Sequence, residues 1–149
     1  MGLLQKRDHD ATTIFPSTTV SIDTVWELAG VGESHRLAYQ VNGFTFVLDV
    51  TASASLLGDW LAVYVQTMLD GVGWVDVVRF GTVTGDLGTA RRVATLRAAL
   101  AQAEFETGTG LAAEAVRHLL GDEWRVRWDI ERGCSVLASF TFSVTAIPM

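Results

Sequence analysis

Few residues in this chain have the types and spacing that catalysis needs. The chain contains three histidines, His9, His35 and His118, and one cysteine, Cys134. A nucleophilic serine or cysteine requires a base within hydrogen-bond reach, yet no histidine lies near Cys134 in the sequence and no Gly-x-Ser-x-Gly elbow occurs. Cys134 falls in an expected turn. We therefore interpret it as an incidental thiol and predict no catalytic residue.

Acidic clusters and glycine pairs also fall short of a recognisable site. Asp8-His9-Asp10 has ligand types suited to a divalent cation, but neighbouring residues in an irregular segment rarely converge on one ion. Glu104 with Glu106 and Asp122 with Glu123 are carboxylate pairs, and their positions favour loop and turn roles. The glycine pairs lack a third glycine and a following lysine; they are Gly30-x-Gly32, Gly71-x-Gly73 and Gly108-x-Gly110. The sequence predicts no metal-binding residue and no cofactor.

A polar stripe and an aromatic residue are the remaining candidates for binding. Arg125 and Arg127 share one face of an expected strand with acidic residues, namely Glu123, Asp129 and Glu131. This pattern favours a face that neutralises itself through salt bridges, with a charged docking face as the alternative. Trp60 falls opposite an alternating apolar set, so it packs in the core or between subunits, anchors a partner, or stacks on a sugar.

Length and charge bound the function classes. The chain has 149 residues, is 49% hydrophobic and carries 11 basic against 17 acidic residues, a formal net charge of −6. These values predict one compact domain without disulfide support. The acidic balance argues against nucleic acid and anionic membranes as partners, since both attract positive charge. We expect a soluble protein made in the cytoplasm, because no leader segment or membrane span is visible in the sequence.

Most of the chain alternates between apolar and polar residues with the period of a β-strand. Alternating runs occur at 18–28, 60–67, 74–84, 123–131 and 139–146. In the first run, Val20, Ile22, Trp26 and Leu28 form the expected inward set. Turn residues separate the runs at intervals of roughly 8–12 residues, which is typical of an antiparallel sandwich or barrel. Residues 1–16 lack this pattern, so we predict an extended N-terminal arm at 1–16 and a β-sandwich domain at 17–149.

Asn42-Gly43 is the clearest local turn signal. It lies between two strand-like runs, Arg36–Val41 and Phe44–Thr51. Asn-Gly tolerates positive φ at both central positions of a type I′ turn, whose twist matches that of paired strands. We therefore predict a β-hairpin at this point.

Two stretches are ambiguous between helix and strand. Residues 89–103 are rich in alanine, leucine and arginine, and Val93, Leu96 and Leu100 fit a helical stripe. The same residues also alternate, so propensity favours a helix without excluding a strand. Residues 111–120 pose the same choice, and a short helix capped by Gly121 is the expectation there.

Three segments together resemble a known protein family. They are VQTMLDGVGWVDVVRF at 65–80, GDEWRVRW at 121–128 and SFTFSV at 139–144. In order and spacing they resemble a group of small β-sandwich proteins among the virion structural genes of tailed bacteriophages and prophages. The resemblance covers roughly residues 44–147. This chain differs from the family pattern at 131–138 and in a longer stretch at 101–120.

The resemblance carries its own expectations. It implies a jelly-roll β-sandwich, no catalytic activity, a strand at 89–99, and a place in the virion, most often as a head decoration or cement protein on the major capsid protein. Such proteins often form trimers, and their arms cross subunit boundaries. We accordingly expect partner contacts from Leu3, Leu4, Ile14 and Phe15 in the arm, and from Trp60. The alternatives are a neck, collar or tail component, or a carbohydrate-binding module using Trp60, Tyr64 or Trp74.

Overall fold

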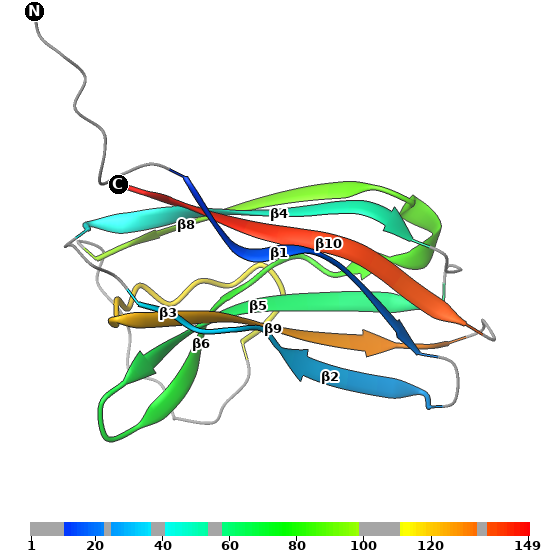
Figure 1. Ribbon diagram of the computed structural model, residues 1–149, viewed down its shortest axis with the longest axis horizontal. Coiled ribbons are helices and arrows are strands. Elements are labelled where there is room, and N and C mark those ends of the chain that lie inside the picture. The colour runs from blue at the N-terminus through cyan, green and yellow to red at the C-terminus, as the bar shows by residue number, and fades with distance from the viewer. Residues whose placement is uncertain (1–10, 23–24, 37–40, 54–57, 99–110, 134–136) are drawn as a thin grey trace, which may run out of the picture.

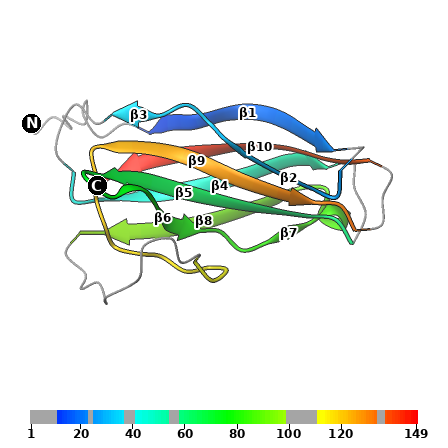
Figure 2. The same cartoon turned by 90° about the horizontal axis from the view of Figure 1, so that it is seen from below.

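The computed structural model describes residues 11–22, 25–36, 41–53, 58–98, 111–133 and 137–149, and these form an all-β antiparallel sandwich (Figures 1 and 2). A four-stranded sheet has the order β1-β10-β4-β8, and a six-stranded sheet has the order β2-β9-β5-β6, with β3 on β9 and β7 on β5. The strand bounds are β1 Thr12–Ile22, β2 Glu27–Val31, β3 His35–Arg36, β4 Gly43–Ser53, β5 Trp60–Leu69, β6 Gly73–Arg79, β7 Val83–Thr84, β8 Ala90–Arg97, β9 Glu123–Glu131 and β10 Ala138–Pro148. A short 3-10 turn, η2, spans Gly85–Leu87.

The strand order is that of a jelly roll. Apart from the two-residue strands β3 and β7, eight strands fill two layers of four, and the chain passes repeatedly from one layer to the other. The first long strand, β1, pairs with the last, β10, which also pairs with β4. The predicted fold class is therefore confirmed. No helix among the described residues is long and apolar enough to cross a membrane.

The core lies between the sheets and follows the alternation seen in the sequence. Phe140, Phe142 and Val144 of β10 are fully buried, and each alternates with a half-buried serine or threonine. β9 buries Trp124, Val126 and Ile130 in the same way. Close-packed apolar side chains of this kind supply the main stabilisation of a sandwich.

The predicted hairpin at Asn42-Gly43 is wrong. β3 pairs with β9 in the six-stranded sheet, whereas β4 begins at Gly43 and pairs with β10 and β8. Asn42 donates its N–H to Met149 O at 2.8 Å, so it extends the sheet instead of turning it. A Cβ on Gly43 would collide with the carbonyl oxygen of Leu96. Glycine is needed here for a close strand approach, not for a turn conformation.

The arm boundary at residue 16 is also wrong. β1 begins at Thr12 and pairs with β10 through two register irregularities, between Thr13 and Phe15 and between Phe15 and Thr18. Ile14 and Phe15 are 5% and 6% exposed, and the Phe15 ring stacks on Phe142 with centroids 4.9 Å apart. The sequence pattern is broken because the strand carries these bulges. Residues 1–10, with Leu3 and Leu4, lie outside the described residues.

Neither ambiguous stretch forms a helix in its described residues, 89–98 and 111–120. Residues 90–97 form β8 and pair with β4 over their whole length, so the strand implied by the resemblance is confirmed and the helix favoured by propensity is wrong. Residues 111–120 form no helix; their one regular pairing is the bridge between Val78 and Val116. In each stretch, backbone hydrogen bonds to a neighbouring strand outweigh helix propensities worth only tenths of a kcal/mol per residue.

Two further expectations need correction. The stretch at 74–84 is not one strand, since β6 ends at Arg79 and β7 takes up only Val83–Thr84. Trp26 and Leu28, predicted to point into the core with Val20 and Ile22, are 62% and 41% exposed. Trp26 directly precedes β2 and Leu28 lies within it, at the edge of the six-stranded sheet.

Candidate functional site

The outer face of the six-stranded sheet carries the densest polar network of the described residues. β5 runs through the middle of this face, and its outward residues Tyr64 and Gln66 are only 6% and 7% exposed. Alternation alone would leave them in solvent. They are buried because long side chains from β9 and β6 lie across them, as the register places Arg127 beside Tyr64 and Asp76 beside Gln66.

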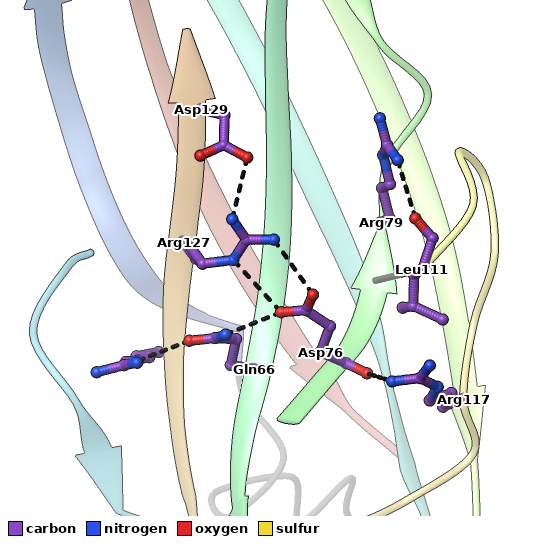
Figure 3. Close-up of polar contacts among 8 residues, drawn as sticks. Gln66, Asp76, Arg79, Leu111, Arg117, Arg127 and Asp129 are labelled. Carbon is purple, nitrogen blue, oxygen red and sulfur yellow. Dashed lines mark hydrogen bonds and ion pairs between the residues drawn. The ribbon is translucent and has the colours of Figure 1, made fainter. Parts of the chain in front are cut away.

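Asp76 is the centre of this network (Figure 3). Its Oδ1 accepts a hydrogen bond from Gln66 Nε2 at 2.8 Å, and its Oδ2 accepts one from Arg127 Nη2 at 3.2 Å. Arg127 Nη1 donates to Asp129 Oδ2 at 3.0 Å, and Arg125 Nε donates to Gln66 Oε1 at 2.7 Å. We call these five residues, Gln66, Asp76, Arg125, Arg127 and Asp129, the Asp76 cluster.

Aromatic rings lie directly beneath the arginines of this face. The Arg127 guanidinium carbon is 3.7 Å from the centroid of the Tyr64 ring, and that of Arg79 is 5.3 Å from the same centroid. Arg125 lies over the Trp74 ring at 4.2 Å. Such cation–π contacts hold planar guanidinium groups flat against the sheet. The rings are therefore covered by side chains of the chain itself.

The segment at 111–120 closes the edge of the sheet beside this cluster. Arg79 donates its backbone N–H to Ala115 O at 3.0 Å, and Arg117 donates its own to Val77 O at 2.7 Å. The Arg79 side chain donates to Leu111 O, and the Arg117 side chain donates to Asp76 O (Figure 3). This segment thus pairs irregularly with β6 and covers an edge that would otherwise be open.

The charges of the cluster are balanced within it. Burial lowers the pKa of Arg127, but the hydrogen bond and charge of Asp76, together with Asp129, outweigh burial and raise that pKa above the ordinary value. The pKa of Arg125 is lowered, first by burial and then by repulsion from Arg127. Two arginines thus face two aspartates. The interpretation of this stripe as a self-neutralising salt-bridge face agrees with these contacts.

The arrangement is suited to rigidity. Both oxygens of Asp76 accept hydrogen bonds, and the network includes no serine, cysteine or histidine beside them. The part of the chain that the structure describes contains no group of three or more metal-ligating side chains. A network with its donors and acceptors paired fixes the relative positions of β5, β6 and β9. Its chemical effect is to hold the sheet in one shape.

The residues predicted for partner binding are not brought together. Ile14 and Phe15 lie in the core, so neither is available as an arm contact. Trp60 is half-buried and lines a small groove of about 260 Å³ with Leu28, Ala29 and other residues. Leu3 and Leu4 lie outside the described residues, as do His9, Cys134 and the Glu104–Glu106 pair.

Sequence reasoning missed the centre of the cluster. The alternation pattern singles out neither Asp76 nor Gln66 as a binding or structural centre. A usable signal was present: Asp76 interrupts a sequence of valines and aromatic residues between Trp74 and Phe80. A lone carboxylate in such a strand needs a partner, and the arginines of 125 and 127 were the available cations.

Comparison of the chain with known proteins gives no relative. No family model matches it, and neither curated proteins nor solved structures provide a match.

Proposed function

We propose that this protein is a non-enzymatic structural component of a tailed-phage virion, a head decoration or cement protein that binds the major capsid protein on the capsid surface. The support is the ordered resemblance of three segments to that family, and the way two of them meet in space. Gln66 and Asp76 come from the segment at 65–80, and Arg125 and Arg127 come from that at 121–128. The motif residues thus form one physical unit, and this observation carries the proposal.

The proposed protein acts by mechanically reinforcing the capsid. A cement protein adds contacts between neighbouring capsid subunits, and its contribution depends on a body that does not deform when the shell is strained. The sandwich supplies a close-packed core, and the Asp76 cluster cross-links β5, β6 and β9 on the outer face. The remaining surface of the body is then free to contact neighbours.

The assignment to the particle has three parts. The protein is made in the host cytoplasm and resides in the virion, its partner is the major capsid protein, and its copies associate, with a trimer as the family expectation. The partner-contacting arm, predicted at residues 1–16, is here proposed for residues 1–10. Leu3 and Leu4 stay as proposed arm contacts, whereas Ile14 and Phe15 are part of the core.

A neck, collar or tail component is the alternative within the same class, since the same fold and resemblance apply to it. The carbohydrate-binding alternative has less support. Its stacking surface would need open rings, but arginines cover Tyr64 and Trp74 and the ring of Trp60 is half-buried. A sugar would have to displace Arg125 and Arg127 from contacts that already satisfy them.

The test uses purified virions. We expect quantitative mass spectrometry to find the protein in particles at a copy number close to that of the major capsid protein, and cryo-electron microscopy to place it over the shell. A few copies at the tail axis would favour the neck or tail alternative. Absence from washed, infectious particles would contradict a virion role of either kind. Binding of the purified protein to empty capsids, measured by co-sedimentation, is the direct check on the partner.

A further inference from the structure

Only one of the sheet edges in the described part of the chain lacks protection against pairing with another strand. The edge at β6 is covered by residues 111–117, and the edge at β8 carries Arg91, Arg92 and Arg97. The edge at β1 is interrupted by two irregularities and by Pro16. Charges, bulges, proline and covering segments are the usual means of blocking an edge. The edge at β2 has none of these beyond a single charge at Glu27.

The unprotected edge is also the most apolar exposed part of the described surface. Nine large hydrophobic side chains are exposed over the whole described surface, and four of them lie at this edge, between residues 25 and 31: Val25, Trp26, Leu28 and Val31. Trp26 alone is 62% exposed. An apolar patch of this kind next to free backbone groups marks an interaction surface.

The hydrogen-bond pattern of β2 determines which of its residues turn their backbone N–H and C=O groups away from β9. Arg132 donates its N–H to Trp26 O at 2.7 Å, and Gly32 donates its N–H to Val126 O at 2.8 Å. In an antiparallel pair such residues alternate with residues that turn their N–H and C=O groups away. Since 26, 28, 30 and 32 face β9, the free groups belong to Glu27, Ala29 and Val31.

These free groups are arranged to pair with themselves. If a second copy adds antiparallel to β2 with the two-fold axis at Ala29, then Glu27 pairs with Val31 of the second copy, and Ala29 with Ala29. On the inner face the same register sets Leu28 opposite Gly30 of the second copy, and Trp26 opposite Gly32. The two large side chains of the inner face, Trp26 and Leu28, thus each meet a glycine of the second copy. A two-fold interface requires this kind of self-complementarity.

The glycines leave room where the register needs it. The Trp128 ring lies over Gly30 so closely that a Cβ there would collide with it, so Leu28 of the second copy would meet an aromatic surface. Gly32 lines a groove of about 600 Å³ with Phe15, Val20 and Trp128, and Trp26 of the second copy would enter it. On the outer face, Glu27 of the second copy joins the row of Val31 and Arg127, which brings an acid toward a cation.

We propose that β2 is a homodimer interface, in which two copies of this chain join their six-stranded sheets by antiparallel β2–β2 pairing about Ala29. The interface is small. Each Trp26 leaves on the order of 100–150 Å² exposed, so the two rings supply on the order of 200–300 Å² of the roughly 1,200 Å² that a stable interface buries. The association is therefore reversible and depends on concentration. The inference goes beyond the virion role and replaces the trimer of the family expectation with a dimer, so a trimer in solution would support that expectation against this interface.

Disulfide trapping tests the register. In a Cys134→Ser background, Ala29→Cys places two thiols at a pair whose Cα atoms are about 5.5 Å apart, within the range that a disulfide spans. Glu27→Cys is the register control, because its two copies would be about 14 Å apart along the strands. Val93→Cys, on exposed β8, is the exposure control. We expect mild oxidation to cross-link Ala29→Cys at least tenfold more than either control. Equal cross-linking of the three variants would overturn the proposal.

Sedimentation of the full-length protein tests the association. We expect a monomer–dimer equilibrium over a concentration series. Ala29→Pro removes only a free N–H, which an edge strand tolerates, and it should raise the dissociation constant at least tenfold while circular dichroism stays unchanged. Ala29→Ser keeps the N–H and should dimerise like the parent. A parent that stays monomeric throughout, or that forms a trimer, would overturn the proposal.

Discussion

At the residue scale, Asp76 shows how one side chain can organise a surface. Its carboxylate is 11% exposed and accepts from Gln66 and Arg127, and its backbone carbonyl accepts from Arg117. A half-buried arginine needs such a partner, because the guanidinium has lost part of its hydration. Removing the charge of Asp76 therefore costs stability mainly because Arg127 is left partly buried without its main ionic partner.

We predict that Asp76→Asn destabilises the protein by about 1–3 kcal/mol, because Arg127 loses its main ionic partner in a partly desolvated position. Urea denaturation followed by tryptophan fluorescence measures this change. Asp49→Asn is the matched control, since Asp49 pairs with Arg91 at 3.1 Å but Arg91 is 68% exposed. Its effect should stay within about 0.5 kcal/mol. Equal losses for the two variants would contradict a special role for the cluster.

Gly30 provides a second residue-scale prediction, because its missing side chain makes room for Trp128. Replacing a glycine within a strand by alanine ordinarily raises the stability of the protein. Here we expect Gly30→Ala to destabilise by about 1–3 kcal/mol through overpacking. Thermal unfolding of Gly30→Ala, Trp128→Leu and the double variant gives the coupling energy between residues 30 and 128. The double variant should be less destabilised than the two single changes summed, whereas simple additivity would argue against the contact.

At the scale of elements, β1 shows how an irregular sequence can form a central part of the fold. Residues 12–22 pair with β10 in three registers separated by irregularities, and the first of them lie where the sequence suggested an arm. Phe15 stacks on Phe142, so this part of β1 belongs to the core and not to a tether. Residues 1–10 and residues 11–16 should therefore behave differently when removed.

We predict that, compared with deleting residues 2–10, deleting residues 2–16 lowers stability by several kcal/mol more. The second deletion removes Ile14 and Phe15 from the core, and loss of one buried phenylalanine alone costs about 3–5 kcal/mol. Differential scanning calorimetry measures both. Capsid binding of the shorter deletion then tests Leu3 and Leu4 without unfolding the sandwich. Similar melting temperatures for the two deletions would place residues 11–16 outside the core.

At the scale of the whole molecule, the topology joins the two ends of the chain. β10 lies between β1 and β4, so the four-stranded sheet is complete only when residues 12–22 and 138–148 meet (Figure 1). Such distant pairings carry the entropy of closing a long loop before any contact stabilises them. Each sheet also takes strands from both halves of the chain.

We therefore predict slow folding, with a rate constant on the order of 1 to 1,000 per second in water, as for other sandwiches dominated by non-local pairs. Stopped-flow dilution from urea, followed by the fluorescence of buried Trp124, measures the rate. A variant lacking residues 138–149 should show no cooperative unfolding, because β1 and β4 lose their common partner. Folding in microseconds, or cooperative unfolding of the truncated chain, would contradict this account.

Alternation along the amino-acid sequence was enough to predict the fold class and much of the core. Alternation at 123–131 and 139–146 predicted which side chains of β9 and β10 point inward, because a residue's face in a strand depends only on its neighbours. The self-neutralising charge of the Arg125–Arg127 face was also visible from the sequence. The strand at 90–97 needed the family resemblance, since local propensity favoured a helix there.

Which strands are neighbours is seen only in the folded molecule. It placed Asn42-Gly43 at the start of β4 instead of in a hairpin turn, and it put Phe15 against Phe142. It brought Asp76 to Gln66 and Arg127, and left Trp26 exposed on an edge. The reason is physical: periodicity and turn propensity report interactions a few residues apart, whereas sheet pairing and edge exposure depend on contacts between residues distant in the chain.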